Sequence, residues 1–403
     1  MKEAYIIDGI RTPIGNFGGT LAAVRADDLA AHVMSELVKR NPTIPAENIT
    51  DVIFGCVNQA GDDNRNVARM SLLLAGIPPS VPGETINRLC ASGMSAIVNA
   101  ARAIKANDGD IFMAGGVENM TRGPYVISKS AKPFGTDAQL FDTSFGWRFI
   151  NPKLDALYGT DAMGKTAENL AELYGISRED QDLFAYNSQQ KAAKSQINGR
   201  FSQEIVGISF PPLRGGQEGL FFSNDEFIKV NTSLEKLATL KAVFKKDGSV
   251  TAGNSSGLND GAMAIYLASE QGIKDYSLTP KARIIASAAT GCEPRVMGIG
   301  PVAATQLALK KAGLTLADID IIELNEAFAA QSLACIRALG LADNDPRINA
   351  NGGAIALGHP LGMSGARITY TAVLELQKQQ KRYALATMCV GVGQGYAVIL
   401  ERC

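Results

Sequence analysis

Short apolar runs alternate in the first part of the chain with stretches in which apolar residues recur every three or four positions. The runs are typical of buried strands, and the spaced stretches are typical of amphipathic helices. Strands are predicted over 4–8, 51–57, 85–89 and 110–116, and helices over 27–38, 66–74 and 94–104. Because strands and helices alternate, we expect a mostly parallel sheet with helices on both faces.

The pattern breaks from about Thr121 to Lys246, where proline and glycine interrupt it repeatedly. Two helices are predicted in this stretch, over 166–174 and 178–195, and the second has a helix-start signal at Ser177. We interpret this part of the chain as an insertion that covers a site.

A sheet-like pattern resumes at Ser249 and predicts strand structure over 251–257 and 262–267. A second half with its own alternation begins near Thr279. Its predicted strands cover 282–286, 319–324, 384–389 and 396–400, and its predicted helices cover 302–312, 331–339 and 365–377. The overall class is therefore α/β.

The two halves resemble each other in sequence. Residues 92–96 (SGMSA) open one predicted helix and residues 362–366 (GMSGA) open another, while 257–265 and 391–399 each lead into a closing strand. Weak similarity over so long a period indicates a duplicated α/β unit. We expect a site between the halves that draws one loop from each.

Composition narrows the classes of function. The net charge of −1 over 403 residues gives no field that would attract nucleic acid or an anionic membrane. The N-terminus has the pattern of a strand and not of a signal peptide, and no apolar run is long enough to span a bilayer. Six scattered cysteines show no disulfide framework, which favours a reducing cytoplasm. With two histidines and no C-x-x-C pair, no metal site is predicted.

Cys90 stands at the head of the helix predicted over 94–104. Unpaired N–H groups and the dipole at a helix N-terminus stabilise an anion, so we expect a lowered thiol pKa there. The small residues Ala91, Ser92 and Gly93 would let a ligand approach the sulfur. Cys90 is a candidate nucleophile; the alternative is a buried cysteine that packs as a small apolar residue.

Three further positions are candidates for chemistry. His359 lies in a tight loop of glycines and a proline, and Asn325 ends a predicted strand. Cys389 ends another strand and precedes Gly391, in a loop whose N–H groups could bind an oxyanion. A histidine with two cysteines fits thioester or acyl-transfer chemistry best.

Four segments together resemble the signature loops of the thiolase family: 87–95, 325–329, 358–362 and 389–395. They occur in the family's order, and the resemblance covers essentially the whole chain. It implies a five-layered α-β-α-β-α thiolase fold built from two duplicated mixed-sheet halves. These would be residues 1–121 with 247–270, and residues 271–403, with a loop domain at 122–246 over the coenzyme A site.

The resemblance also implies roles for individual residues. Cys90 would be the acylated nucleophile, His359 would activate it, and Cys389 would be the acid/base at the substrate α-carbon. Asn325 would hold a water that forms one oxyanion hole with His359. The N–H groups of Cys90 and Gly391 would form the second oxyanion hole.

Coenzyme A is expected as a substrate, with no permanently bound cofactor. By resemblance, the pantetheine path would be lined by Ser256, Phe244, Ala327, Phe328 and Met163. Lys229 falls where many thiolases carry an arginine near the adenine nucleotide. The expected partners are small acyl-CoA molecules and further copies of the chain, as a dimer or a homotetramer.

Three segments, 62–70, 146–152 and 294–301, resemble the 3-oxoadipyl-CoA thiolases of aromatic-compound degradation. Such enzymes cleave 3-oxoadipyl-CoA with CoA into succinyl-CoA and acetyl-CoA. The distal carboxylate of that substrate calls for a cation, and Arg148 is our candidate. Many acetoacetyl-CoA thiolases have a histidine just before the residue that corresponds to Met163, whereas this chain has Ala162.

Other functions stay open from the sequence alone. A general 3-ketoacyl-CoA or acetoacetyl-CoA thiolase is the nearest alternative. A non-catalytic acyl-CoA-binding protein would need none of Cys90, His359 and Cys389. A decarboxylating condensing enzyme usually lacks a second catalytic cysteine, which Cys389 would supply.

Overall fold

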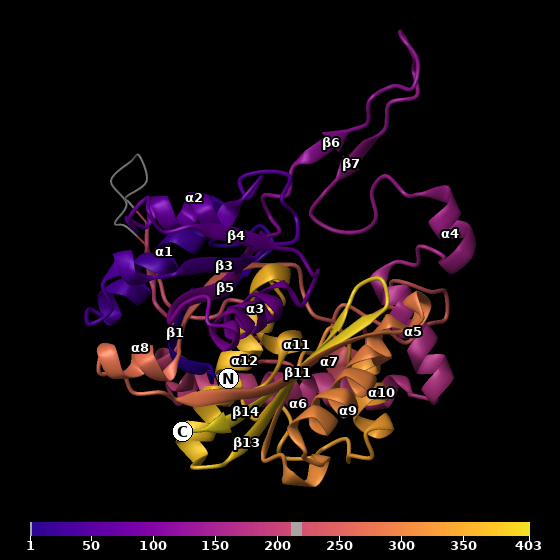
Figure 1. Ribbon diagram of the computed structural model, residues 1–403. Helices are drawn as coiled ribbons and strands as arrows, with labels where there is room; N and C mark the ends of the chain where they lie inside the picture. The colour runs from indigo at the N-terminus through magenta and orange to yellow at the C-terminus, as the bar shows by residue number, and fades with distance from the viewer. Residues whose placement is uncertain (1, 211–219) are drawn as a thin grey trace.

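The computed structural model of the chain describes residues 2–210 and 220–403. Its main sheet runs in the order β12-β13-β14-β11-β1-β10-β5-β3-β4, with β2 paired to β10 (Figure 1). The strands of the first half are β1 (Tyr5–Arg11), β2 (Gly15–Asn16), β3 (Asp51–Gly55), β4 (Gly83–Ile86), β5 (Ile111–Asn119) and β10 (Asn259–Ala268). The strands of the second half are β11 (Ala282–Gly291), β12 (Ile321–Leu324), β13 (Tyr383–Val390) and β14 (Gln394–Arg402).

Helices cover both faces of each half and also fill the space between the halves. The helices on the outer face of the first half are α1 (Ala26–Arg40), α2 (Val67–Leu74) and α8 (Glu270–Asp275). The second half carries α9 (Gly300–Ala312), α10 (Ala329–Ala338) and α11 (Ala354–Leu357). The central pair consists of α3 (Ser92–Ala106) and α12 (Leu361–Gln379). The central pair packs on strands of both halves and α9 packs on the other face of β11 and β14, which gives five layers.

In the described parts of residues 122–246, which are 122–210 and 220–246, no strand joins the main sheet. Their elements are β6 (Tyr125–Ile127), β7 (Leu140–Asp142), α4 (Pro152–Tyr158), α5 (Met163–Tyr174), α6 (Arg178–Ile197), β8 (Ile208–Ser209), β9 (Phe221–Phe222) and α7 (Leu234–Ala238). The β6–β7 hairpin projects from the body of the molecule (Figure 1). The division into three parts at 121, 246 and 270 stays a prediction.

The strand and helix predictions agree with the structure to within a few residues at most ends, with two corrections. The sheet is mixed and not mostly parallel, since β1, β10, β5, β11, β14 and β13 pair antiparallel. Among the strands that the structure describes, the parallel pairs are β3–β4, β3–β5 and β12–β13. A short turn joins β13 to β14, and so tight a connection permits only an antiparallel pair.

The second correction concerns residues 251–257, which form a turn and not a strand. The Asn254 side chain accepts the Thr251 N–H at 2.8 Å, and the Ser255 hydroxyl donates to the Thr251 carbonyl at 2.7 Å. Such local side-chain bonds compete with ladder pairing. One bridge remains, between Ser255 and Phe328.

The N-termini of α3 and α12 meet with backbone against backbone. A Cβ atom on Gly93 would lie 2.6 Å from the Gly362 carbonyl oxygen, and one on Gly116 would lie 2.0 Å from the same oxygen. Only glycine permits so close an approach. This glycine joint, formed by Gly55, Gly93, Gly116 and Gly362, brings one loop of each half to the same place.

Candidate active site

The loop between β4 and α3 presents Cys90 two residues before the helix begins. Leu89 has a left-handed backbone with φ of 45°, which turns the chain sharply. The Ser92 hydroxyl donates to the Leu89 carbonyl at 2.6 Å and accepts the Arg88 N–H at 2.9 Å. The side chain of Ser92 thus fixes the loop that carries the cysteine.

The Cys90 sulfur is held by backbone N–H groups from both halves. The N–H groups of Gly391 and of Cys90 itself hydrogen-bond the thiol and favour its ionised form. Burial is the larger effect, and with the charge of Glu118 it raises the pKa of Cys90 to about 11. The prediction of a lowered pKa is therefore wrong for the resting protein, because lost hydration outweighs the helix N-terminus.

His359 is buried in the loop before α12, and hydrogen bonds hold both its ring and its backbone N–H. Its Nδ1 lies 2.6 Å from the Ser364 hydroxyl, and its backbone N–H donates to Asn259 Oδ1 at 2.9 Å. Ser364 donates its own proton to the Pro360 carbonyl at 2.8 Å, so its oxygen accepts from Nδ1–H. This network assigns the tautomer and leaves the Nε2 lone pair to act as a base.

The imidazole ring is neutral in the resting protein. Burial, together with the positive charge of Arg367, lowers the pKa of His359 to about 3. The Asn325 amide lies 3.4 Å from Nε2, and the backbone N–H of Asn325 donates to the Thr387 carbonyl of β13 at 3.0 Å. Strands β12 and β13 thereby hold Asn325 beside the histidine.

Cys389 lies near the end of β13 with its side chain buried. Burial raises the pKa of this thiol well above its usual value, and the neighbouring Cys90 sulfur raises it further. The turn that follows returns Gly391 to the Cys90 loop, where a Cβ on Gly391 would lie 3.0 Å from Leu89 Cδ1. The five residues predicted to carry chemistry are therefore gathered at one place from both halves.

Four of the residues expected along the pantetheine path pack with Cys389 in one apolar cluster: Met163, Phe244, Ala327 and Phe328. The rings of Phe244 and Phe328 meet edge to face with centroids 6.2 Å apart. The backbone N–H of Ser256 donates to the Ala327 carbonyl at 2.9 Å, which ties the 251–257 turn to this cluster.

Lys229 lies apart from that cluster, on a cleft of about 510 Å³. Its ammonium stands 5.2 Å from the centre of the Phe227 ring, and its backbone N–H donates to Gln189 at 2.8 Å. Ala252 and Gly253 also line the cleft, as does Ile355 of α11. The cleft thus borders both the 251–257 turn and the short helix that precedes the His359 loop.

The sequence analysis missed three residues that hold the site together: Ser364, Asn259 and Glu118. Ser364 and Asn259 both bond His359, as described above. The sequence held one signal for Ser364. The three residues GMS occur both at 93–95 and at 362–364, so each repeat places a serine two residues after a glycine of the joint. Asn259 lies in the repeated segment 257–265, which the sequence analysis used only as evidence of duplication, and no pattern in the sequence marked Glu118.

Two family models, the N-terminal and C-terminal domains of thiolase, match residues 4–271 and 278–402. The chain belongs to the thiolase family. The structure is similar to that of *Bacillus anthracis* acetyl-CoA acetyltransferase, with a TM-score of 0.92 and 40% identity, covering 100% of this chain and 99% of the other. It is also similar to the structure of human mitochondrial 3-ketoacyl-CoA thiolase in complex with CoA, with a TM-score of 0.91 and 40% sequence identity. This match covers 100% of this chain and 98% of the other. The thiolase fold expected from the sequence is thereby confirmed.

Curated thiolases of bacteria are more similar in sequence. A protein of *Escherichia coli* strain K12 named 3-oxoadipyl-CoA/3-oxo-5,6-dehydrosuberyl-CoA thiolase is 58% identical over 402 residues, covering 100% of both chains. A beta-ketoadipyl-CoA thiolase of *Acinetobacter baylyi* is 57% identical over 402 residues with the same coverage. Membership of this family makes the chain an acyltransferase, as predicted.

The neutral thiol and imidazole generate a pH prediction. Alkylation of Cys90 by iodoacetamide, followed by mass spectrometry of the Cys90 peptide, should accelerate mainly between about pH 9 and 11, since only the thiolate reacts. No step should appear near pH 6.5, because His359 stays neutral down to about pH 3. Cys403, which is exposed, provides an internal comparison. A plateau of Cys90 reactivity already at pH 7 would contradict the neutral pair.

Proposed function

We propose that this thiolase cleaves 3-oxoadipyl-CoA with CoA to give succinyl-CoA and acetyl-CoA. The observation that carries the proposal is the convergence of Cys90, His359 and Cys389 at one joint. The names of relatives at 57–58% identity over their full length support this substrate. Ala162, in place of the histidine of many acetoacetyl-CoA thiolases, supports it further.

The residues divide the reaction into two half-reactions. Cys90 gives its proton to Nε2 of His359 and attacks the 3-oxo carbon, and the C2–C3 bond then breaks. The enolate of acetyl-CoA leaves and takes a proton from the Cys389 thiol. In the second half, Cys389 takes the proton of the CoA thiol, and the CoA sulfur attacks the thioester on Cys90 and releases succinyl-CoA. His359 then returns the first proton to the Cys90 thiolate that leaves.

Negative charge develops on the substrate oxygens in both halves of the reaction. The N–H groups of Cys90 and Gly391, which already surround the Cys90 sulfur, are suited to bind one oxyanion. Asn325 and His359 are suited to the other, at the enolate of acetyl-CoA. Each preorganised donor of this kind lowers the barrier by about 3–4 kcal/mol.

The CoA part of the substrate requires apolar and cationic surface. We assign the pantetheine path to the cluster of Met163, Phe244, Ala327 and Phe328, beside Ser256. We assign the nucleotide end to the cleft at Lys229. In this assignment residues 122–246 are the loop domain that covers CoA.

A thiolysis assay tests the proposal. Purified protein should release acetyl-CoA from 3-oxoadipyl-CoA and CoA with a kcat/KM at least about tenfold above that for acetoacetyl-CoA or longer 3-oxoacyl-CoA esters, a margin of about 1.4 kcal/mol. Cys90→Ala should abolish turnover and the acyl adduct on the Cys90 peptide. Equal rates on all esters would point to a general 3-ketoacyl-CoA thiolase. Acyl-CoA binding without turnover would contradict the proposed function.

Arg148 is our candidate for the distal carboxylate of the substrate. It is half-buried next to Trp147, whose indole N–H donates to the Asp161 carbonyl at 3.3 Å. In the part of the chain that the structure describes, no carboxylate pairs with Arg148, whereas Arg295 is paired with Asp161 at 3.0 Å. Arg148 is therefore a half-buried cation of this region that remains available to a ligand.

Substitution tests this role. Arg148→Gln should raise KM for 3-oxoadipyl-CoA about tenfold to a hundredfold, because a hydrogen bond to a charged group contributes about 1.5–3 kcal/mol. Turnover of acetoacetyl-CoA, which has no distal carboxylate, should not change. Lys153→Gln, at an exposed lysine of α4, is the matched control. An unchanged KM for 3-oxoadipyl-CoA would remove Arg148 from the site.

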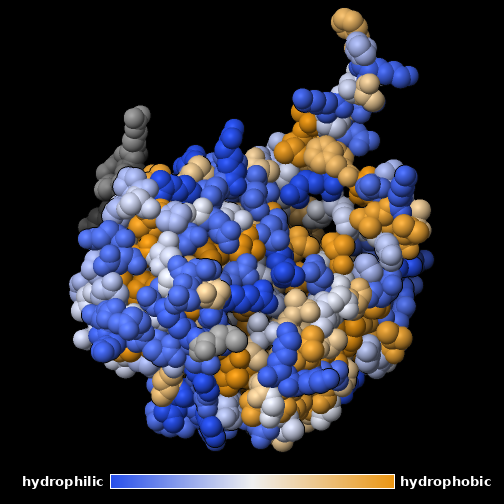
Figure 2. Space-filling view, in the orientation of Figure 1, coloured by the Kyte–Doolittle hydropathy of each residue, from blue (hydrophilic) through white to orange (hydrophobic). Residues whose placement is uncertain are grey.

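The projecting hairpin supports a homo-oligomer. Tyr125, Ile127 and Leu140 are each about two-thirds exposed or more, and Phe134 at its end is fully exposed. Figure 2 shows hydrophobic side chains along this projection. Exposed apolar surface of this kind marks an interaction site, and we propose a second copy of the chain as its partner.

Sedimentation tests the assembly. The double variant F134S/L140S should reduce the mass of the particle in analytical ultracentrifugation, since it removes the apolar contacts of the hairpin. Lys132→Ser, in the same hairpin, should leave the mass unchanged. A wild-type monomer would contradict the proposal.

The free state of all six cysteines is consistent with a reducing compartment, and we propose the cytoplasm. None of the described helices is long and apolar enough to cross a membrane.

A further inference from the structure

Glu118 lies in β5 at the glycine joint, with its side chain buried. Three backbone N–H groups donate to its carboxylate: Gly362 at 2.9 Å, Val57 at 3.0 Å and Asn58 at 3.0 Å. Val57 and Asn58 follow β3 of the first half, whereas Gly362 belongs to the first turn of α12 in the second half. One carboxylate therefore bonds the chain on both sides of the joint.

The position of α12 is limited from two directions. A Cβ on Gly362 would lie 2.3 Å from the Val117 carbonyl oxygen and 2.8 Å from that of Gly55, so the helix cannot approach the sheet more closely. The bond from Gly362 to Glu118 keeps the helix from moving away. His359 is three residues before Gly362 and is bonded to Ser364 of the same first turn. The location of His359 thus follows that of the helix N-terminus.

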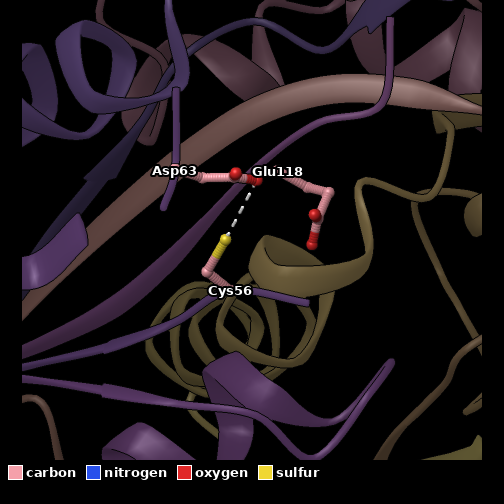
Figure 3. A group of neighbouring side chains, drawn as sticks. All are labelled: Cys56, Asp63 and Glu118. Carbon is pink, nitrogen blue, oxygen red and sulfur yellow. Dashed lines mark hydrogen bonds between the residues drawn. The ribbon is translucent and has the colours of Figure 1, made fainter. Parts of the chain in front are cut away.

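The charge of Glu118 also reaches the nucleophile. It raises the pKa of Cys90, in opposition to the N–H groups that surround the sulfur. The groups that face Glu118 are Asp63 and Cys56, with Cys56 donating to Asp63 over 3.6 Å (Figure 3). Burial and the charge of Asp63 raise the pKa of Glu118 to about 8, while its three N–H bonds oppose them.

Cys56, Asp63 and Glu118 bring three potential metal-ligand atoms within 4.8 Å of one another. The sequence analysis predicted no metal site and did not foresee this cluster. The Glu118 oxygens already accept three N–H bonds, and Asp63 accepts the Gly61 N–H at 2.9 Å and the Cys56 thiol. Both carboxylates of the cluster thus already bond backbone N–H groups.

We propose that Glu118 is a positioning residue of the thiolase reaction: its carboxylate holds the N-terminus of α12, and with it His359, at a fixed place beside Cys90. An anion at a helix N-terminus is favoured by the helix dipole and by unpaired N–H groups. The kinetic part of this inference rests on the proposed function.

Two substitutions at Glu118 separate the effect of its charge from the effect of its side-chain length. Glu118→Gln puts an amide N–H among N–H donors and removes the charge. At pH 9, where Glu118 with its pKa of about 8 is ionised, this change should lower kcat about 100-fold with little change in KM, since a misplaced catalytic group costs about that much. Glu118→Asp keeps the charge but shortens the side chain, so it should lower kcat less.

Alkylation of Cys90 by iodoacetamide as a function of pH provides a readout that a merely structural role would not move. In Glu118→Gln the midpoint should move to lower pH, because the repelling charge is gone, while in Glu118→Asp it should stay near that of the wild type. Rates of turnover are to be normalised to the Cys90 that alkylation titrates, so that unfolded protein does not count.

Asp63→Asn is the matched control, since it removes a neighbouring buried charge without touching α12. It should keep kcat within about threefold of the wild type, as expected for a group that does not orient a reacting residue. Wild-type kcat in Glu118→Gln, or an equal loss in Asp63→Asn, would overturn the proposal. If Glu118→Gln does not fold, an unchanged kcat in Glu118→Asp would overturn it.

Failure of the proposed function is distinguishable from failure of this inference. A wild-type protein that does not cleave 3-oxoadipyl-CoA would contradict the proposed function. The alkylation midpoints need no acyl-CoA, so an unshifted midpoint in Glu118→Gln would overturn the effect of Glu118 on Cys90 by itself.

Discussion

The close contact between the N-termini of α3 and α12 is the constraint on which the rest of the site depends. Cys90 lies three positions before Gly93, and His359 lies three positions before Gly362. Because glycine backbones touch at the joint, the nucleophile and the base, which come from opposite halves, have little freedom to move apart. Gly391 then joins the second half to the Cys90 sulfur through its own N–H group.

The electrostatics of the site keep the reacting groups uncharged until a substrate arrives. Burial raises the pKa of both thiols and lowers that of the imidazole, so the stable pair is thiol and neutral base. This state suits a proton transfer that occurs as the sulfur attacks, because N–H donors are already in place for the charge that then develops. Burial thus disfavours the charged forms of the two thiols and the imidazole in the free protein.

Much of this architecture could be predicted from the sequence, because its local signals agree with the fold. The apolar spacing of Met94, Ile97 and Ile104 predicted a helix whose residues are buried, and the repeat of SGMSA as GMSGA predicted that two such helices correspond. The direction of the strands could not be predicted, since alternation says nothing of how β10 returns after the long insertion. Nor could the pKa of Cys90, which depends on hydration lost to residues distant in the chain. The partners of Glu118 lie 60 to 244 positions away and leave no local pattern.

A sulfhydryl that retains its proton at neutral pH is also slow to be oxidised, since peroxides and stray electrophiles react with the anion. The same burial that delays ionisation therefore protects the most vulnerable atom of the protein between turnovers. An exposed cysteine that is reactive is usually also easily oxidised. Here the thiol loses its proton only when the sulfur attacks a substrate, so the nucleophile can be reactive in turnover and resistant to oxidation at rest.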